Sequence, residues 1–370
     1  GNQQRNGYIR NIGGYYFIDS YAGQIFNLSD QIKTMDKGLK RWVNDNSKFK
    51  LLEQVIDYPF IDNTVIGIGW HFGYDPKFNR LLITKIDYEF IDPTQYAGHL
   101  NEAICTVGKV YLHPDGRFVL IVDTDCSYSF VDFNNTDIFC NVSWTLSFSY
   151  LSDSYVSWHS YLPYKYFNTR KEFFSAIENK IYKHNIEHDY QVFYDEYRPF
   201  DLEFPIKNTL SNITDSIIYY QDAYTFDSIY KREVSKDVTF THGFLYNSKQ
   251  NTGWFDFVKK DDFDETNMQI SIKDELDKVK VNRIEKGWYY NEIADNVIDN
   301  TIPHTTVKCG DNPADLTPND VAIDQAKPFY IRMPFRDNYI IQRLRLNNIQ
   351  FRNVRINVKT FAAANTKSLR

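Results

Sequence analysis

The stretch Ser143–Asn185 reads SWTLSFSYLSDSYVSWHSYLPYKYFNTRKEFFSAIENKIYKHN and contains two hairpin-like pairs of short alternating runs. In the first pair, apolar side chains alternate from Trp144 to Tyr150, and a turn rich in Ser and Asp leads into a return strand at 155–159. The second pair, 173–176 and 180–184, flanks a turn. Two hairpins in about forty residues have the size of one four-stranded propeller blade. The stretch therefore predicts such a blade.

Weaker echoes of this pattern occur elsewhere in the chain. The runs around Gly23 and around Asp115–Gly116 predict hairpins, because these residues favour tight turns between β-prone segments. Further strands are expected in 65–90, at Ser216–Tyr220 and at Val238–Phe240, and a short helix is expected at Asp36–Val43. The predicted fold is mainly β: an irregular β-propeller, partial or completed by another fragment, with an extended β/loop region.

The domain organisation follows from where this pattern changes. Residues 1–198 are predicted to form propeller blades, and 199–329 an extended strand and loop region with an insertion. This second region includes the charged run Lys259–Glu265 and the proline-rich segment Asn300–Pro328. Residues 330–370 are predicted to form basic terminal β-strands. These strands suit closure of a sheet or pairing with a neighbour.

Composition narrows the class of protein. Aromatic residues make up 17% of the 370 residues, which favours strands and large packed surfaces. No run of about eighteen apolar residues occurs, so we expect no membrane span. The four cysteines lack C-x-x-C spacing. We therefore expect small buried thiols in a chain assembled in a reducing compartment.

Charge is unevenly distributed along the chain. Residues 331–370 carry nine basic and one acidic residue, 9 − 1 = +8, so the first 330 residues carry −6 − 8 = −14. The candidate interface consists of the arginines of these terminal strands: Arg343, Arg345, Arg352 and Arg355. Three interpretations remain open: contact with an acidic neighbouring subunit, contact with nucleic acid, and an ordinary solvated face.

No residue pattern predicts catalysis, a cofactor or a metal site, so we expect no enzyme. His159 and Ser160 are adjacent, and adjacent strand residues point to opposite faces, which favours packing over a nucleophile–base pair. His184 and His188 have i, i+4 spacing but follow a strand, which disfavours zinc binding. Asp123 and Asp125 are expected to be turn residues, because no calcium-loop pattern surrounds them.

Several blocks resemble a known group of proteins. They are HFGYDPKFNRLLITK (71–85), SWTLSFSYLSDSYVSWHSYLP (143–163), EFFSAIENKIYKHN (172–185) and FRDNYIIQRLRLNN (335–348). Over roughly Gly7 to Lys359 the chain resembles the tail stabilisation, or muzzle (nozzle), proteins of crAss-like bacteriophages. The resemblance implies a structural virion protein containing a β-propeller. It also implies a hexameric ring at the tail tip that closes the tail channel, retains the genome and passes it during DNA ejection.

The resemblance also implies partners and a location. Copies of the chain itself, other tail proteins and, transiently, genomic DNA would contact it in a virion assembled in the bacterial cytoplasm. A strongly acidic wall would let DNA slide, because it does not hold phosphates. Members of the family are usually longer at the N-terminus. A chain that opens at Gly1 is therefore expected to be the C-terminal fragment of a cleaved precursor, with the upstream fragment as a partner.

Two alternative functions stay open at this point. A carbohydrate- or receptor-binding propeller module of a phage tail, which could also cleave glycans, would suit the abundance of aromatic residues. Such a module needs exposed Trp or Tyr side chains and, for cleavage, paired carboxylates. A secreted bacterial propeller module is disfavoured because the N-terminal residues lack the apolar core of a signal peptide.

Overall fold

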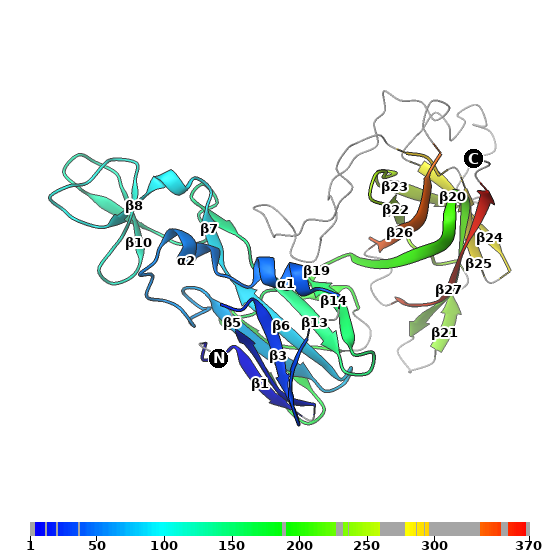
Figure 1. Cartoon of the computed structure of the whole chain (residues 1–370), viewed down its shortest axis with the longest axis horizontal. Helices are drawn as coiled ribbons and strands as arrows, with labels where there is room; N and C mark the ends of the chain where they lie inside the picture. The colour runs from blue at the N-terminus through cyan, green and yellow to red at the C-terminus, as the bar shows by residue number, and fades with distance from the viewer. Residues whose placement is uncertain are drawn as a thin grey trace. The chain divides into compact units, whose positions relative to one another are not determined.

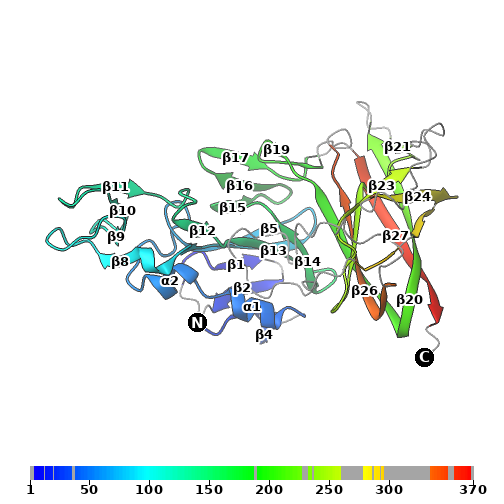
Figure 2. The ribbon, with the colours of Figure 1, turned by 90° about the horizontal axis from the view of Figure 1, so that it is seen from above.

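The computed structural model describes residues 4–11, 13–19, 21–35, 38–186, 190–226, 232–235, 237–259, 278–285, 287–291, 293–295, 334–348 and 354–367. The chain divides into two compact units. Unit 1 holds the described residues up to Asn185, and unit 2 holds those from Ile186 onward. Both are built mainly of strands (Figures 1 and 2), so the expected mainly β class is confirmed.

The first sheet of unit 1 is an antiparallel meander of four strands, in the order β1-β2-β3-β4. They are β1 (Tyr8–Asn11), β2 (Gly14–Asp19), β3 (Gln24–Leu28) and β4 (Ile32–Thr34). The predicted turn at Gly23 is confirmed: its φ of 63° suits glycine, and the Asp19 carboxylate accepts the N–H groups of Tyr21 and Ala22. Tyr16 and Ile18 turn their side chains into the core of the unit.

The central sheet of unit 1 has the strand order β14-β13-β6-β5. Its strands are β5 (Gly69–Asp75), β6 (Arg80–Ile86), β13 (Trp144–Ser149) and β14 (Ser154–His159). Leu146 of β13 lies opposite Ile83 of β6. The first predicted hairpin of Ser143–Asn185 is thus confirmed, but the expectation that the whole stretch forms one four-stranded blade is wrong. Because β13 is buried on both faces, it takes a central position between β14 and the distant β6.

The second predicted hairpin belongs to a separate, three-stranded sheet. This third sheet consists of β15 (Lys165–Asn168), β16 (Phe173–Ile177) and β17 (Lys180–Lys183). It is attached to the central sheet by Tyr166, whose hydroxyl lies 2.6 Å from the Thr84 hydroxyl. The Tyr166 ring covers Gly73, where an added Cβ would lie only 2.5 Å from the ring. Glycine at this position therefore allows the two sheets to approach closely.

Two short helices, α1 (Lys40–Asn46) and α2 (Lys50–Gln54), cover part of the unit 1 core. The predicted helix near Asp36–Val43 corresponds to α1, which buries Trp42 and Val43. The Trp42 ring lies 4.7 Å from Trp144 and 4.2 Å from Trp158, both edge-on. Edge-on aromatic pairs of this kind add stability beyond the area that they bury.

A buried ion pair fixes α2 against the end of β6. The Lys85 ammonium lies 2.7 Å from the Asp87 carboxylate, and both side chains are inaccessible to solvent. The same carboxylate accepts the backbone N–H groups of Lys50 at 2.7 Å and Leu51 at 3.3 Å. Asp87 thereby caps the first turn of α2, whose own N-cap side chain makes no such bond.

An insert projects from unit 1 between β6 and β13. Its strands are β7 (Tyr88–Phe90), β8 (Tyr96–His99), β9 (Val110–Leu112), β10 (Phe118–Ile121), β11 (Tyr128–Val131) and β12 (Phe139–Asn141), with a 3-10 helix, η1 (Pro93–Gln95). β7 and β12 pair with each other at the base of the insert, and β8–β11 form a four-stranded sheet that both views show at one end of the unit (Figures 1 and 2). The predicted hairpin with Gly116 in its turn is confirmed as β9–β10.

Unit 2 contains a small ribbon and one large sheet. Its strands are β18 (Val192–Phe193), β19 (Glu196–Tyr197), β20 (Phe200–Phe226), β21 (Arg232–Ser235), β22 (His242–Tyr246), β23 (Phe255–Lys259), β24 (Lys278–Ile284), β25 (Gly287–Asn291), β26 (Arg336–Leu346) and β27 (Val354–Lys367). The order β20-β25-β24-β23-β22-β26 closes into a ring because β26 pairs again with β20. Leu344 and Tyr290 are among the residues of its apolar core. Closure removes exposed edges from these strands.

Some local predictions differ from the structure. Val238–Phe240 is not a strand: Gln221 donates to the Val238 carbonyl, and the Tyr219 and Thr239 hydroxyls pair at 2.7 Å. Side-chain bonds thus replace a strand ladder there. The segment Asn300–Pro328 and all but the first residue of Lys259–Glu265 lie outside the described residues. In the part of the chain that the structure describes, no helix is long and apolar enough to span a bilayer.

Candidate interaction sites

Two arginines of the predicted interface converge on one carboxylate of unit 2. Arg343 and Arg345 lie on β26, and both guanidinium groups bond Asp201 of β20, at 2.6 Å and 2.7 Å. The Arg343 side chain is buried, and that of Arg345 is partly exposed. Arg343 is therefore an internal structural residue in this chain, whereas Arg345 keeps a limited exposed surface.

An aromatic side chain covers this arginine pair. Trp254 lies 4.2 Å from the Arg345 guanidinium and 5.6 Å from that of Arg343, which gives cation–π contacts. Next to it, the Tyr246 hydroxyl donates to the Glu203 carboxylate at 3.0 Å. Strand register explains the cluster: β22, β26 and β20 are neighbours, and alternate residues on one face of these strands meet in rows.

We predict that Asp201→Asn lowers the free energy of unfolding of unit 2 by about 2–3 kcal/mol, since it removes the charge of the carboxylate that both Arg343 and Arg345 bond. Guanidinium unfolding measures the change in the free energy of unfolding, and hydrogen exchange of β26 peptides locates it. The matched control is Asp256→Asn, which removes the more exposed pair with His242 at 3.1 Å. The control is expected to cost less than about 1 kcal/mol. Equal losses in the two variants would contradict a special role for Asp201.

The other two arginines of the predicted interface are placed differently. Arg355 is exposed on β27, where it lies opposite Tyr224 of β20. Arg352 lies outside the described residues. Of the three described arginines, Arg343 and Arg345 on β26 share one carboxylate and Arg355 lies on a different strand, so a role of Arg355 in an interface stays a prediction.

The histidines singled out in the sequence belong to the packing of unit 1. His159 packs against Tyr161 with tilted rings whose centroids are 4.8 Å apart, and burial lowers the pKa of His159 well below the usual value. The His184 ring lies 2.6 Å from the hydroxyl of the fully buried Ser175, and burial lowers its pKa to about 4. His188 lies outside the described residues. Within the described ranges, no group of three or more His, Cys, Asp or Glu side chains could hold a metal ion.

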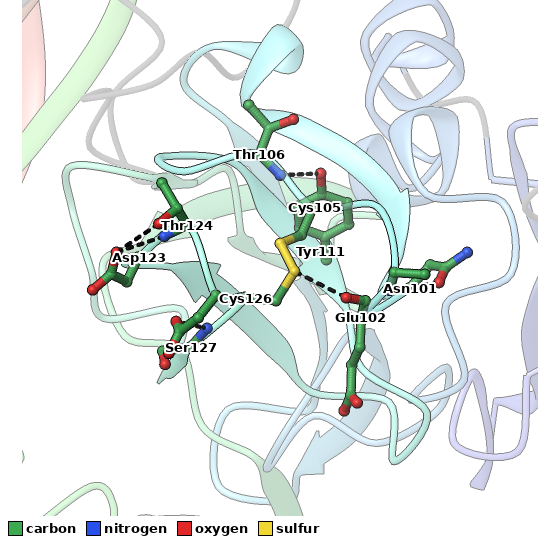
Figure 3. The surroundings of a disulfide bond; sticks show 11 residues. Asn101, Glu102, Cys105, Thr106, Tyr111, Asp123, Thr124, Cys126 and Ser127 are labelled. Carbon is green, nitrogen blue, oxygen red and sulfur yellow. Dashed lines mark hydrogen bonds between the residues drawn. A yellow bond between two sulfur atoms is a disulfide. The ribbon is translucent and has the colours of Figure 1, made fainter.

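The turn around Asp123 and Asp125 is a structural turn, as expected, but it is joined to a second loop. Asp123 accepts the Thr124 N–H and Asp125 accepts the Ser127 N–H. Cys126 in this turn forms a disulfide with Cys105 (Figure 3). The expectation that all cysteines are buried thiols is therefore wrong. The turn chemistry brings Cys126, with φ 65°, against the loop that carries Cys105, and their Cα atoms are 5.8 Å apart.

Exposed apolar side chains gather around this disulfide. Ile104 is 75% exposed, and Val107 and Val122 are also exposed. Val107 and Val122 are close together. Gly108, which follows Val107, donates its N–H to the carbonyl of Ile121, which precedes Val122, at 2.9 Å. Large apolar side chains at the end of a projecting insert are typical of surfaces that contact other molecules. We refer to residues 101–108 and 122–127 as the tip.

A second surface cluster lies on the same insert. Arg117 stacks on Phe130 at 3.6 Å, and Asp115 holds its guanidinium from the side at 2.8 Å. His113 and Tyr128 pack beside them. Because Arg and aromatic residues that are fixed in place often contribute to binding surfaces, this cluster is a further candidate for contact with a partner.

Sequence reasoning missed the tip for an identifiable reason. The two cysteines are 21 residues apart and flank a predicted hairpin, a spacing that fits a bridge across its base. However, without a C-x-x-C motif the sequence favoured unpaired thiols over a disulfide. No tryptophan of the chain is fully exposed, since Trp158 and Trp254 are half-buried and the other four are buried. No family model and no curated protein sequence matches this chain.

Proposed function

We propose that this chain is a structural subunit of a ring-shaped assembly, the muzzle or nozzle at the tail tip of a bacteriophage, which retains the genome and passes it during ejection. The resemblance of the sequence blocks motivates this proposal. The first, central and third sheets of unit 1 support it, because neighbouring strands in each are antiparallel and follow one another along the chain, apart from the insert between β6 and β13, as in a propeller blade or part of one. In this proposal the sheets are blades of an irregular propeller that is completed by another chain or fragment.

The observation that carries the proposal is the character of the sheet edges in unit 1. Each of the three sheets has an edge strand with an exposed aliphatic side chain: Ile32 on β4 (64%), Val156 on β14 (50%) and Ile181 on β17 (68%). Exposed aliphatic side chains on sheet edges suit contacts with neighbouring subunits. The edges also carry charge, with Lys33 on β4 and Lys180 and Lys183 on β17, whereas β14 has no Lys, Arg, Asp or Glu.

Localisation in the phage particle provides the test of this function. Antibodies against the chain are expected to label one end of purified virions, at the tail tip, in electron micrographs. They are also expected to reduce DNA ejection. Absence of the chain from the peptides of purified virions would refute the proposal, as would labelling confined to the capsid.

Self-association provides an independent test on the purified chain. Native mass spectrometry is expected to show a closed oligomer, and Ile181→Lys is expected to shift it toward the monomer by replacing the exposed aliphatic side chain of β17 with a third positive charge. Leu151→Lys is the matched control, because Leu151 is at least as exposed (83% against 68% for Ile181) but lies in the turn before β14. Unchanged circular dichroism would show that both variants fold. An oligomer that Ile181→Lys leaves intact would exclude this edge from the interface.

A further inference from the structure

The Cys105–Cys126 disulfide joins two exposed loops of the insert. Every residue of the tip except the two cysteines is exposed, and the cysteines are half-buried. Figure 3 shows the bond crossing between the loop of Asn101–Thr106 and the turn of Asp123–Ser127. A disulfide between half-buried cysteines in an exposed tip suits exchange with small-molecule thiols and disulfides.

Few other described contacts connect the two loops. At their base, the Gly108 N–H bonds the Ile121 carbonyl, and the Ile121 N–H bonds the Lys109 carbonyl. Further out, most backbone hydrogen bonds stay within one loop. The Ile104 N–H bonds the Asn101 carbonyl in the first loop, and the Cys126 N–H bonds the Asp123 carbonyl in the second. One contact crosses between the loops besides the disulfide: Cys126 Sγ lies 3.1 Å from the Glu102 carbonyl.

The apolar core beneath the tip is small. It consists of Tyr111, Val119 and Ile121, with three partly buried side chains packed against them. The Tyr111 hydroxyl accepts the Thr106 N–H at 3.0 Å. The principal core of unit 1 is a separate cluster made by the first and central sheets, the helices, the base of the insert, and Val110, Leu112 and Phe118 of β9 and β10. Loss of the disulfide should thus loosen the tip and leave the rest of unit 1 folded.

We propose that Cys105–Cys126 is a redox-dependent staple of the tip: the pair is reduced where the chain is made, and its oxidation after release fixes Ile104, Val107 and Val122 in place. This inference rests on the proposed function, since a virion protein is made in a reducing cytoplasm and works outside the cell. It also explains how a chain that is made in a reducing cytoplasm can contain the Cys105–Cys126 disulfide.

The chemistry is two consecutive thiol–disulfide exchanges with a small-molecule disulfide such as oxidised glutathione. One cysteine loses its proton, and its thiolate attacks a sulfur of the oxidant, which releases one glutathione thiolate and forms a mixed disulfide. The second cysteine thiolate then attacks the protein sulfur of that mixed disulfide and releases the second glutathione. Two electrons pass from the protein to the oxidant, and the two released thiolates take up the two protons.

The test uses the full chain equilibrated in glutathione buffers from fully reduced to fully oxidised. Alkylation of free thiols, located at Cys105 and Cys126 by peptide mapping, reports the state of the pair, and hydrogen exchange reports the order of the tip. Closing a loop of about twenty residues constrains the open ensemble enough to slow exchange in tip peptides by roughly 100-fold. Peptides of β5, β6 and β13 are expected to exchange at the same rate in the two states.

Single variants assign the effect to this bond. Because no cysteine among the described residues is a free thiol, reduction alone is not specific to the tip. Cys105→Ser and Cys126→Ser are each expected to give fast tip exchange in every buffer, with the other peptides unchanged. A tip that exchanges equally in both states, or a bond that persists in buffer dominated by reduced glutathione, would overturn the proposal. These measurements use the purified chain and not the virion. Their failure can therefore be distinguished from failure of the proposed function, which antibody labelling tests.

Discussion

Lys85→Met is expected to lower the free energy of unfolding of unit 1 by about 3–5 kcal/mol, because it leaves the buried Asp87 carboxylate without a countercharge. Burial opposes both charges of the pair, lowering the pKa of Lys85 and raising that of Asp87, so each charged form depends on the other. Asp87 also caps α2 through the N–H groups of Lys50 and Leu51. The loss should therefore extend from β6 to this helix.

Hydrogen exchange of β6 and α2 peptides, together with urea unfolding, measures this effect. Lys50→Met is the matched control, because Lys50 pairs with Glu53 at 3.4 Å on the surface and its loss should cost less than about 1 kcal/mol. The double variant Lys85→Met, Asp87→Leu should recover most of the loss, apart from about 1 kcal/mol for the missing cap. A single Lys85 variant as stable as the control would show that the buried charges are not coupled.

Acidification is expected to destabilise unit 1 between pH 6.5 and about pH 4. Burial, with a smaller effect of Lys165, lowers the pKa of His71 to about 4 in the folded chain, whereas the unfolded chain binds a proton near pH 6.5. The unfolded state thus takes up protons first as pH falls, and stability present above pH 6.5 is lost. This shift corresponds to about 3 kcal/mol for His71 alone.

Two further histidines act in the same direction. Burial lowers the pKa of His184, with Asp75 opposing the shift and Arg80 adding to it, and burial next to Arg80 and His184 lowers the pKa of His159. His184 follows β17 and bonds Ser175 of β16, and His159, at the end of β14, is linked to it through the ring of Tyr161. The attachment of the third sheet to the central sheet should therefore be lost early during acidification.

Urea unfolding at pH 7.5, 6, 5 and 4.5, followed by hydrogen exchange in β5 and β16, tests this expectation. His71→Gln should flatten the pH dependence of stability, because the variant lacks one group that binds a proton on unfolding. The exposed His99 provides the matched control, and His99→Gln should keep the slope of the unaltered chain. Stability that stays constant from pH 7.5 to 4.5 would contradict the assigned burial of these rings.

The local parts of this fold could be predicted from the sequence. The β2–β3, β9–β10, β13–β14 and β16–β17 hairpins depend on short alternating runs and on turn residues such as Gly23 and Gly116, which act within a few positions. The helix around Trp42 followed from its spacing of apolar residues in the same way. A single sequence records these features directly, because each is stabilised by neighbours in the chain.

The parts that could not be predicted depend on distant partners. Nothing near β13 shows that it pairs with β6, about 60 residues earlier in the chain, and nothing near Arg343 shows that Asp201 will neutralise it. Both arrangements arise because a buried strand or charge must find a partner, and many candidates satisfy that requirement equally. The alternation of Arg343 and Arg345 with leucines therefore looked like a surface stripe.

The long strand β20 has a consequence for how the chain is made. It pairs with β25, β26 and β27, and the ring of unit 2 closes only when β26, ending at Leu346, reaches it. The described sheets of unit 1 are complete by Lys183. During synthesis, unit 1 can therefore fold before β26 has been translated. Until then, the edge of β20 that pairs with β26 is exposed. Such an edge invites pairing with other nascent chains, so the rate of translation between Phe226 and Arg336 becomes a determinant of yield.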